Sequence, residues 1–210
     1  MPNTTNNYLI PLAPAEFKIT IKGSKFLGHC EPVSDEAAAM EFIKQRSRQF
    51  HSATHNCWAY RVGDSSQPTE RSSDEGEPSG TAGRPILEQL AKLNLIGAAL
   101  IVSRWFGGTK LGRGGLIRAY GGCAAETLEL LKTEIRQPMT AITVECGYDL
   151  VGFIERTTLK CKGYVEDREF AEFVRLTVKL PAETGELFQR ILSDDGGGKV
   201  SVVNVKPDCF

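Results

Sequence analysis

Along the first two thirds of the chain, segments with the hydrophobic pattern of strands are followed by segments with the hydrophobic pattern of helices. Between residues 16 and 33 apolar and polar positions alternate, which predicts a strand with one buried face, interrupted by a turn or bulge at Gly23-Ser24. The uninterrupted apolar run over 96–103 is typical of a strand covered on both faces. Apolar positions three and four residues apart predict amphipathic helices between the strands. The other elements expected here are a strand over 55–62 and helices after the N-cap Ser34, over 84–93 and over 115–135.

A second pattern begins at Met139, directly after the helix end expected before Pro138. It predicts the element order β-α-β-β-α-β, which is that of a ferredoxin-like sandwich. We therefore predict an α+β protein of two domains, residues 1–138 and residues 139–210. The elements expected in the second domain are a strand from Met139, a helix capped by Asp149, strands over 162–169 and 172–180, a helix opened by Pro181 and a strand over 200–205.

The composition is that of a globular protein without a strong overall field. Of the 210 residues 41% are hydrophobic and 24% are charged, and the net charge is −1, so any basic site must be local. No run approaches the roughly 18 apolar residues of a membrane span, and the first residues show no signal-peptide pattern. The six cysteines form no C-x-x-C pair. We therefore expect reduced thiols, a cytoplasmic location and no membrane association.

One segment, residues 104–118, concentrates glycine and positive charge. It reads R-W-F-G-G-T-K-L-G-R-G-G-L-I-R and holds no acidic residue. Glycine lets a ligand approach the backbone closely, and the N-terminus of the following helix offers unpaired N–H groups and a partial positive charge. The segment therefore predicts an anion-binding site, most simply for phosphate. Its predicted members are the cations Arg104, Lys110, Arg113 and Arg118 and the glycines Gly107, Gly108, Gly112, Gly114 and Gly115.

Alternatives stay open for this segment. It completes neither a Walker A motif nor a dinucleotide-binding fingerprint, because Arg113-Gly114 stands where Lys-Ser/Thr is required and Ile117 replaces the last glycine of the fingerprint. It could instead be a tight structural turn whose cations are solvated. Trp105 and Phe106 could stack on nucleic-acid bases, or they could belong to the core or to the wall of a cleft.

A second candidate lies in the long polar segment 63–85. Asp74, Glu75 and Glu77 are close enough in sequence to hold a hard cation by oxygen, although their spacing matches no calcium loop. They could also line the same cleft as the cations of residues 104–118, or form a solvated flexible loop. A loop of this length inside a domain is usually functional or disordered.

The histidines give a weaker signal. His51, His55 and Cys57 have a spacing that can suggest zinc, but no glutamate follows His51 and no fourth ligand stands out. We interpret His51 and His55 as a structural or cleft-facing pair, and we predict no metal and no cofactor. No marked nucleophile motif is present, so catalytic residues stay unassigned, although a catalytic set could still assemble in three dimensions.

Three blocks of this sequence resemble the signature blocks of the IMPACT family in its bacterial YigZ-type form. They are H-S-A-T-H-N-C-W-A-Y-R over 51–61, S-D-E-G-E-P-S-G-T-A-G-R-P over 73–85 and V-S-R-W-F-G-G-T-K-L-G-R-G-G-L-I-R-A-Y over 102–120. The resemblance implies a ribosomal protein S5 domain 2-like α/β fold for residues 1–138. It also implies that the two domains are similar to domains IV and V of elongation factor G, with residues 139–210 as the counterpart of domain V.

The resemblance further implies a connection with translation. Eukaryotic relatives are implied to regulate translation by competing for a protein partner, through an N-terminal domain not found in these 210 residues. The leading hypothesis is a cytosolic, non-enzymatic regulator of translation that binds RNA or the ribosome through the basic glycine-rich loop. One alternative is an enzyme, a hydrolase of a phosphorylated or peptide substrate that uses the acidic loop 74–77. The other is a protein-interaction module whose cleft accepts an acidic segment. The sequence gives no oligomeric state.

Overall fold

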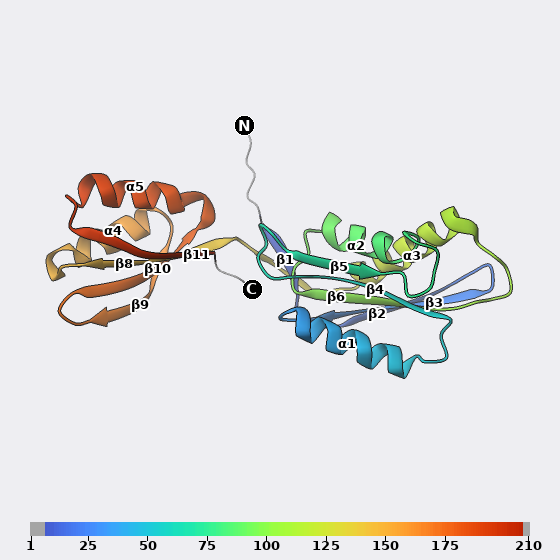
Figure 1. Cartoon of the computed structure of the whole chain (residues 1–210). Helices are drawn as coiled ribbons and strands as arrows, with labels where there is room; N and C mark the ends of the chain where they lie inside the picture. Colours follow the sequence, from blue (N-terminus) through green and yellow to red (C-terminus); the bar gives the residue numbers. More distant parts are fainter. Residues whose placement is uncertain (1–6, 208–210) are drawn as a thin grey trace, which may run out of the picture. The chain divides into compact units, whose positions relative to one another are not determined.

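The computed structural model describes residues 7–207, which divide into two compact units (Figure 1). The described part of the N-terminal unit covers residues 7–136, and that of the C-terminal unit covers residues 137–207. Each unit has a buried core of its own. In the described range, no helix combines the length and the apolar character needed to cross a membrane.

The N-terminal unit is built on an antiparallel sheet with helices on both faces. Its elements are β1 (Tyr8–Pro11), β2 (Ala15–Ile21), β3 (Ser24–Pro32), α1 (Glu36–Gln49), β4 (His55–Val62), β5 (Thr69–Ser73), α2 (Gly83–Lys92), β6 (Ala98–Trp105), α3 (Gly112–Glu129) and β7 (Thr133–Arg136). The main sheet has the strand order β2-β3-β6-β4-β5, and β1 pairs separately with β7. Helix α1 packs on one face of the main sheet, while α2 and α3 pack on the other (Figure 1).

Strand β6 lies at the centre of this sheet and has helices on both sides. Leu100 and Val102 pack into the core under α2 and α3. Ala99 and Ile101 alternate with them and pack under α1 on the opposite face. The prediction of a strand covered on both faces is confirmed, because an apolar residue is needed at every position when neither face meets water.

The first helix has a different cap from the one expected. The Asp35 carboxylate accepts a hydrogen bond from the Ala38 backbone N–H at 2.8 Å and is the N-cap of α1. Ser34 only donates its hydroxyl to Asp35, at 3.0 Å. Both residue types cap helices well, so composition alone did not separate two adjacent candidates.

Strands β5 and β7 and both boundaries of helix α3 were not predicted. Strand β5 has exposed or half-exposed side chains throughout and lies at the sheet edge, where it pairs with β4. Helix α3 begins at Gly112 rather than at Gly115, and it ends at Glu129 because residues 133–136 form β7 and pair with β1. Long-range pairing therefore overrides the helical pattern that continued to residue 135.

The C-terminal unit has the expected order of elements, with two short 3-10 turns in addition. The elements are β8 (Met139–Cys146), a 3-10 turn (Tyr148–Leu150), α4 (Val151–Lys160), β9 (Tyr164–Phe170), β10 (Val174–Pro181), a second 3-10 turn (Ala182–Thr184), α5 (Gly185–Asp195) and β11 (Val200–Pro207). The strand order is β11-β8-β10-β9, with all pairs antiparallel. Both helices contribute to one core with the sheet, through Ile154 of α4 and Phe188 of α5. Asp149 was wrongly predicted as a cap, because it lies inside the first 3-10 turn and no side chain caps α4.

Candidate anion-binding site

Residues 104–118 lead from the end of a buried strand to the start of a helix at the surface. Strand β6 ends at Trp105, residues 106–111 form a loop, and α3 begins at Gly112. Helix α3 is fixed on the sheet by its buried face, which includes Leu116 and Tyr120. The loop is therefore held at both ends by elements of the core.

The first cation of the segment, Arg104, lies inside the protein. Only 5% of this residue is exposed. Its Nη1 donates a hydrogen bond to the Glu77 carboxylate, and its Nη2 donates to Ser24 Oγ at 3.4 Å. Its guanidinium also lies 5.5 Å from the centre of the Phe26 ring. This position corrects the expected role of Arg104, because a buried guanidinium already neutralised by a carboxylate is not presented to a surface anion.

Glu77 is the partner that makes the burial of Arg104 possible. Its side chain is 3% exposed, and its Oε1 also accepts a hydrogen bond from the Tyr120 hydroxyl at 2.9 Å. The Nε2 of His55 lies 4.0 Å from the same oxygen. Burial, together with the neighbouring Cys57 and Glu77, raises the pKa of Tyr120, so its hydroxyl stays protonated and donates. The acidic segment and the basic segment thus meet, but as a buried polar network and not as two walls of a surface cleft.

Gly107 anchors the loop on the β2–β3 turn. A Cβ on Gly107 would stand 1.9 Å from the carbonyl carbon of Gly23, so no side chain fits between the two backbones. The Gly107 N–H donates to Ser24 Oγ at 3.1 Å. This contact explains the first glycine of the segment as a structural residue.

Two of the remaining glycines have open space around them. Gly108 and Gly112 have φ values of +86° and +71°, and a Cβ at either position would have no neighbour within 4 Å. Gly114 and Gly115 form the first turn of α3. That turn has no acidic residue, and Leu111 at the cap position makes no side-chain hydrogen bond to it. The N-terminal N–H groups of α3 are therefore free of any capping side chain, as an anion site requires.

Three cations surround this helix start. Lys110, Arg113 and Arg118 are all exposed. Arg113 donates from Nη2 to the Ser79 carbonyl at 2.9 Å. Arg118 Nη1 lies 3.5 Å from the place a Cβ on Gly114 would occupy, so its guanidinium lies back over the first turn. Within residues 7–207 none of the three forms an ion pair, so their charges are not neutralised by the fold.

The Asp74 carboxylate is hydrogen-bonded to the backbone of its own loop. Its carboxylate accepts hydrogen bonds from the N–H groups of Gly80, Ala82 and Gly83 at 2.7, 2.8 and 2.9 Å. Partial burial would raise the pKa of Asp74, but these donors outweigh it and hold the pKa below its usual value. Asp74 therefore shapes the loop that leads into α2.

Glu75 is fixed in a similar way at a positive φ of 40°. Its Oε1 accepts from Ser73 Oγ at 2.8 Å and from Trp58 Nε1 at 3.3 Å. Its carbonyl oxygen lies 2.9 Å from His55 Nδ1. No cluster of three or more His, Cys, Asp or Glu side chains suited to a metal ion is found in the described part of the chain.

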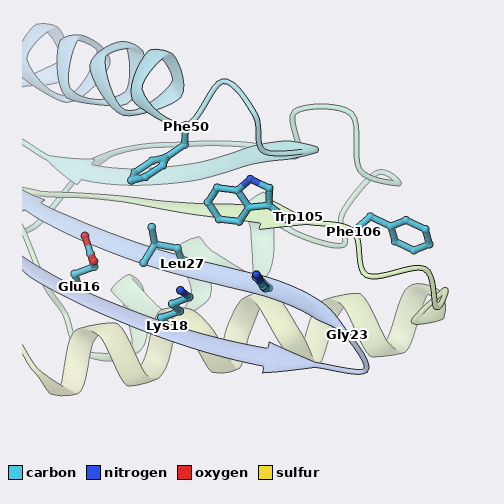
Figure 2. Close-up of a pocket in the computed structure, with 8 residues that line it drawn as sticks. Glu16, Lys18, Gly23, Leu27, Phe50, Trp105 and Phe106 are labelled. Atoms are coloured by element: carbon cyan, nitrogen blue, oxygen red, sulfur yellow. The ribbon is translucent and has the colours of Figure 1, made fainter.

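The adjacent residues Trp105 and Phe106 lie in different environments. The Trp105 ring is half-buried, donates from Nε1 to Ser52 Oγ at 3.2 Å and meets the Phe50 ring edge to face (Figure 2). Phe106 is 48% exposed. His51 is exposed and its Nδ1 lies 3.2 Å from the Arg48 carbonyl oxygen, whereas the His55 ring faces Glu75 and Glu77. Among the described residues the two histidines share no partner, so the structure does not present them as a pair.

Three residues outside segment 104–118 contact the site and were not predicted from the sequence. They are Ser24, Thr54 and Tyr120. Ser24 accepts from the Gly107 N–H, and the Thr54 hydroxyl accepts from the Phe106 N–H at 3.0 Å. Tyr120 closes the Glu77 network. Tyr120 ended the third quoted block, so that block was a usable signal, whereas no pattern marks Ser24 or Thr54.

Fold and site together define a mixed α/β protein of two units that presents a basic glycine-rich turn at the start of a helix. The Impact N-terminal domain family matches residues 22–128, which include all three quoted blocks. The chain belongs to the IMPACT family, and the resemblance seen in the sequence is confirmed.

The likeness to bacterial relatives extends over nearly the whole chain. IMPACT family member YvyE of Bacillus subtilis (strain 168) is 34% identical over 197 residues, covering 94% of this chain and 90% of the relative. IMPACT family member YigZ of Escherichia coli (strain K12) is 34% identical over 202 residues, covering 95% and 98%. A crystal structure described as that of a hypothetical protein is 32% identical, covers 95% of this chain and 98% of its own, and has a TM-score of 0.63.

Proposed function

We propose that this protein is a cytosolic, non-enzymatic regulator of translation that binds RNA or the ribosome through loop 106–111 and the first turn of α3. The observation that carries the proposal is the uncapped, acid-free start of α3 beside Lys110, Arg113 and Arg118. Free N–H groups, a helix dipole and unpaired cations at one place favour phosphate oxygens. The net charge of −1 restricts this attraction to the site itself.

The link with translation comes from the family and from the proposed domain classes. We propose that residues 1–138 are an S5 domain 2-like domain and that residues 139–210 are a ferredoxin-like domain resembling domain V of elongation factor G. The strand order β11-β8-β10-β9 supports the second assignment, because it joins the two βαβ halves of that topology in one antiparallel sheet. The proposed similarity to two domains that work inside the ribosome favours RNA as the source of the phosphates.

The enzyme alternative is less well supported by the same geometry. A general base needs a free carboxylate within reach of a substrate. Glu77 is buried against Arg104, and Asp74 is saturated by backbone N–H groups. Burial also raises the pKa of Cys57 to about 12, so it is a poor nucleophile.

The proposal is tested by fluorescence anisotropy of a labelled single-stranded RNA titrated with the full chain at several salt concentrations. Three phosphate-pairing cations predict a slope of log K against log salt of about −2 or steeper. Lys110→Ala with Arg113→Ala is expected to weaken binding at least tenfold at low salt and to reduce the slope by about 1.4. Lys92→Ala with Lys132→Ala removes the same charge from exposed positions elsewhere and is the matched control.

Two results would contradict the proposal. One is an affinity that does not depend on salt. The other is equal weakening by the site variant and by the matched control, which would indicate a diffuse charge effect only. A partner captured from a lysate after nuclease treatment, and lost in Lys110→Ala with Arg113→Ala, would favour the protein-interaction alternative.

A further inference from the structure

Beside the glycine-rich loop, the sheet has an area that no helix covers. Helix α1 ends at Gln49, and the chain turns at Phe50 to enter β4. Helix α1 therefore covers Ile101 but stops short of the ends of β2, β3 and β6. A hollow of about 490 Å³ lies there (Figure 2). We call it the sheet-end hollow; its lining includes Lys18, Lys25, Leu27, Phe50, Trp105 and Phe106.

Strand register places the floor of the sheet-end hollow on one face. Lys25 pairs with Trp105, and Lys18 pairs with Leu27. Lys25 and Leu27 are two positions apart on β3, so all four side chains point to the same side of the sheet. The opposite side carries Phe26, which belongs to the core. The sheet-end hollow therefore combines two lysines with an apolar and aromatic floor.

Trp105 is held in place before any ligand arrives. Its Nε1 bond to Ser52 and its edge contact with Phe50, at 5.9 Å between ring centres, fix the ring while it lines the hollow. In Figure 2 it lies between Phe50 and Phe106. A fixed ring loses little conformational entropy when a flat ligand stacks on it.

The charges of the sheet-end hollow favour an anion. Lys18 and Lys25 are exposed, and in the described structure neither forms a hydrogen bond or an ion pair through its side chain. Glu16 is the acidic residue of the lining, and its carboxylate is 3.2 Å from His29 Nδ1. Aromatic rings beside unpaired lysines are the composition of surfaces that bind single-stranded nucleic acids, where bases stack and phosphates pair.

We propose that the sheet-end hollow is a stacking platform for a short single-stranded RNA segment, with bases on Trp105 and phosphates at Lys18 and Lys25. This inference rests on the proposed function. Strand β6 leads from Trp105 directly into loop 106–111, so the two proposed surfaces are adjacent along the chain. An acidic peptide would pair with the lysines but would leave the aromatic face unused, so RNA is the better match.

Tryptophan fluorescence of the full chain provides the test. The two tryptophans are Trp58 and Trp105, so Trp58→Phe leaves Trp105 as the single reporter. A single-stranded oligouridylate is expected to quench its emission saturably, because a stacked base quenches indole. An RNA duplex of equal length is expected to quench much less, since its bases are already stacked. Trp105→Phe, which leaves Trp58, is the matched control and is expected to show no quenching.

Charge variants test the lysines independently. Lys18→Ala with Lys25→Ala is expected to weaken oligouridylate binding about tenfold and to reduce the salt slope by about 1.4, whereas Lys92→Ala with Lys132→Ala changes neither. Trp105→Leu, which keeps an apolar side chain, is expected to weaken binding about tenfold. Circular dichroism confirms that each variant is folded.

The outcomes separate this inference from the proposed function. RNA binding that depends on Lys110 and Arg113, but leaves Trp105 emission and the Lys18 and Lys25 variant unaffected, overturns the stacking platform alone. Absence of RNA binding in the anisotropy assay overturns both proposals. Polyglutamate that binds as tightly as oligouridylate and equally requires Lys18 and Lys25 overturns the RNA assignment in favour of an acidic peptide.

Discussion

Arg104 and Arg113 belong to the same glycine-rich segment but occupy opposite environments. Arg104 is on β6, whose pleat directs it under α3, where Glu77 and Tyr120 complete a buried network. Arg113 is in the first turn of α3, is exposed and donates to the Ser79 carbonyl. One arginine holds the loop in position, and the other remains available for a ligand. Cations that are neighbours in the sequence are therefore not all available to bind a ligand.

The difference is also energetic. A buried guanidinium is stable only while its carboxylate partner is present, because desolvation of a lone charge is costly. A surface guanidinium keeps most of its hydration and contributes little to folding. Stability and binding are therefore expected to depend on different ends of residues 104–118.

The largest effect is expected at the buried pair. Arg104→Ala or Glu77→Ala should lower the free energy of unfolding by about 3–5 kcal/mol, because each leaves an unpaired buried charge. Arg113→Ala should change it by less than about 0.5 kcal/mol. Urea unfolding followed by circular dichroism measures both. Arg104→Met combined with Glu77→Leu should recover much of the loss. Equal costs for Arg104→Ala and Arg113→Ala would show that the buried pair does not stabilise the fold.

A smaller effect is expected at Asp74. Asp74→Ala should cost about 2–3 kcal/mol at pH 7, because three backbone N–H groups lose a charged acceptor. The folded pKa of Asp74 lies below the usual 3.8 of an aspartate side chain. Its contribution is therefore complete above that value and is lost as pH falls through the lower folded pKa.

Urea unfolding at pH 7 and in the acid range checks the direction of this pH dependence. The difference between the wild type and Asp74→Ala should narrow toward low pH. Glu75→Ala, which removes a neighbouring and more exposed carboxylate, is the control and should cost less. A difference that grows on acidification would show that Asp74 is not stabilised as the charged form.

The two adjacent glycines of the loop, Gly107 and Gly108, also differ in their surroundings. Gly107→Ala should lower the free energy of unfolding by about 2 kcal/mol, because its Cβ would overlap the Gly23 backbone. Gly108→Ala meets no neighbour and should cost only about 1 kcal/mol for its positive φ. Thermal unfolding of both variants tests this order, and a reversed order would show that the loop is not anchored on the β2–β3 turn.

The smallest effect is expected at the thiol of Cys57, close to Glu77 and Tyr120. Burial raises the pKa of Cys57 to about 12, so almost no thiolate is present at pH 8. Native protein treated briefly with iodoacetamide should therefore show little alkylation of the Cys57 peptide by mass spectrometry, while urea-unfolded protein should react fully. Rapid native alkylation would mean that the interior around Glu77 is open.

Secondary structure was predictable where one face or both faces of an element meet the core. Strand β4 has the expected bounds, and β6 was recognised from its continuous apolar run. Strands β5 and β7 carry no such pattern, because both are short and mostly exposed and depend on pairing with distant partners. Hydrogen bonding between segments far apart in sequence is invisible to a local pattern.

The candidate site was likewise predictable only in part. The glycines and cations of residues 104–118 were predicted as a group, and Lys110, Arg113 and Arg118 do surround the start of α3. The burial of Arg104 was not predicted, because strand parity decides it only once the covering helix is known. The sheet-end hollow was also invisible, since it exists only because α1 ends before β6 does.

The family, the order of most elements and the segment in which positive charge and glycine concentrate could all be identified from the sequence. Hydrophobic periodicity and residue type are local properties, so they can be read without coordinates. Tertiary structure alone decided which of those charges are paired, which glycines touch another backbone and where the sheet is left uncovered. Each of these depends on contacts between segments distant in the chain, such as Arg104 with Glu77 and Gly107 with Gly23.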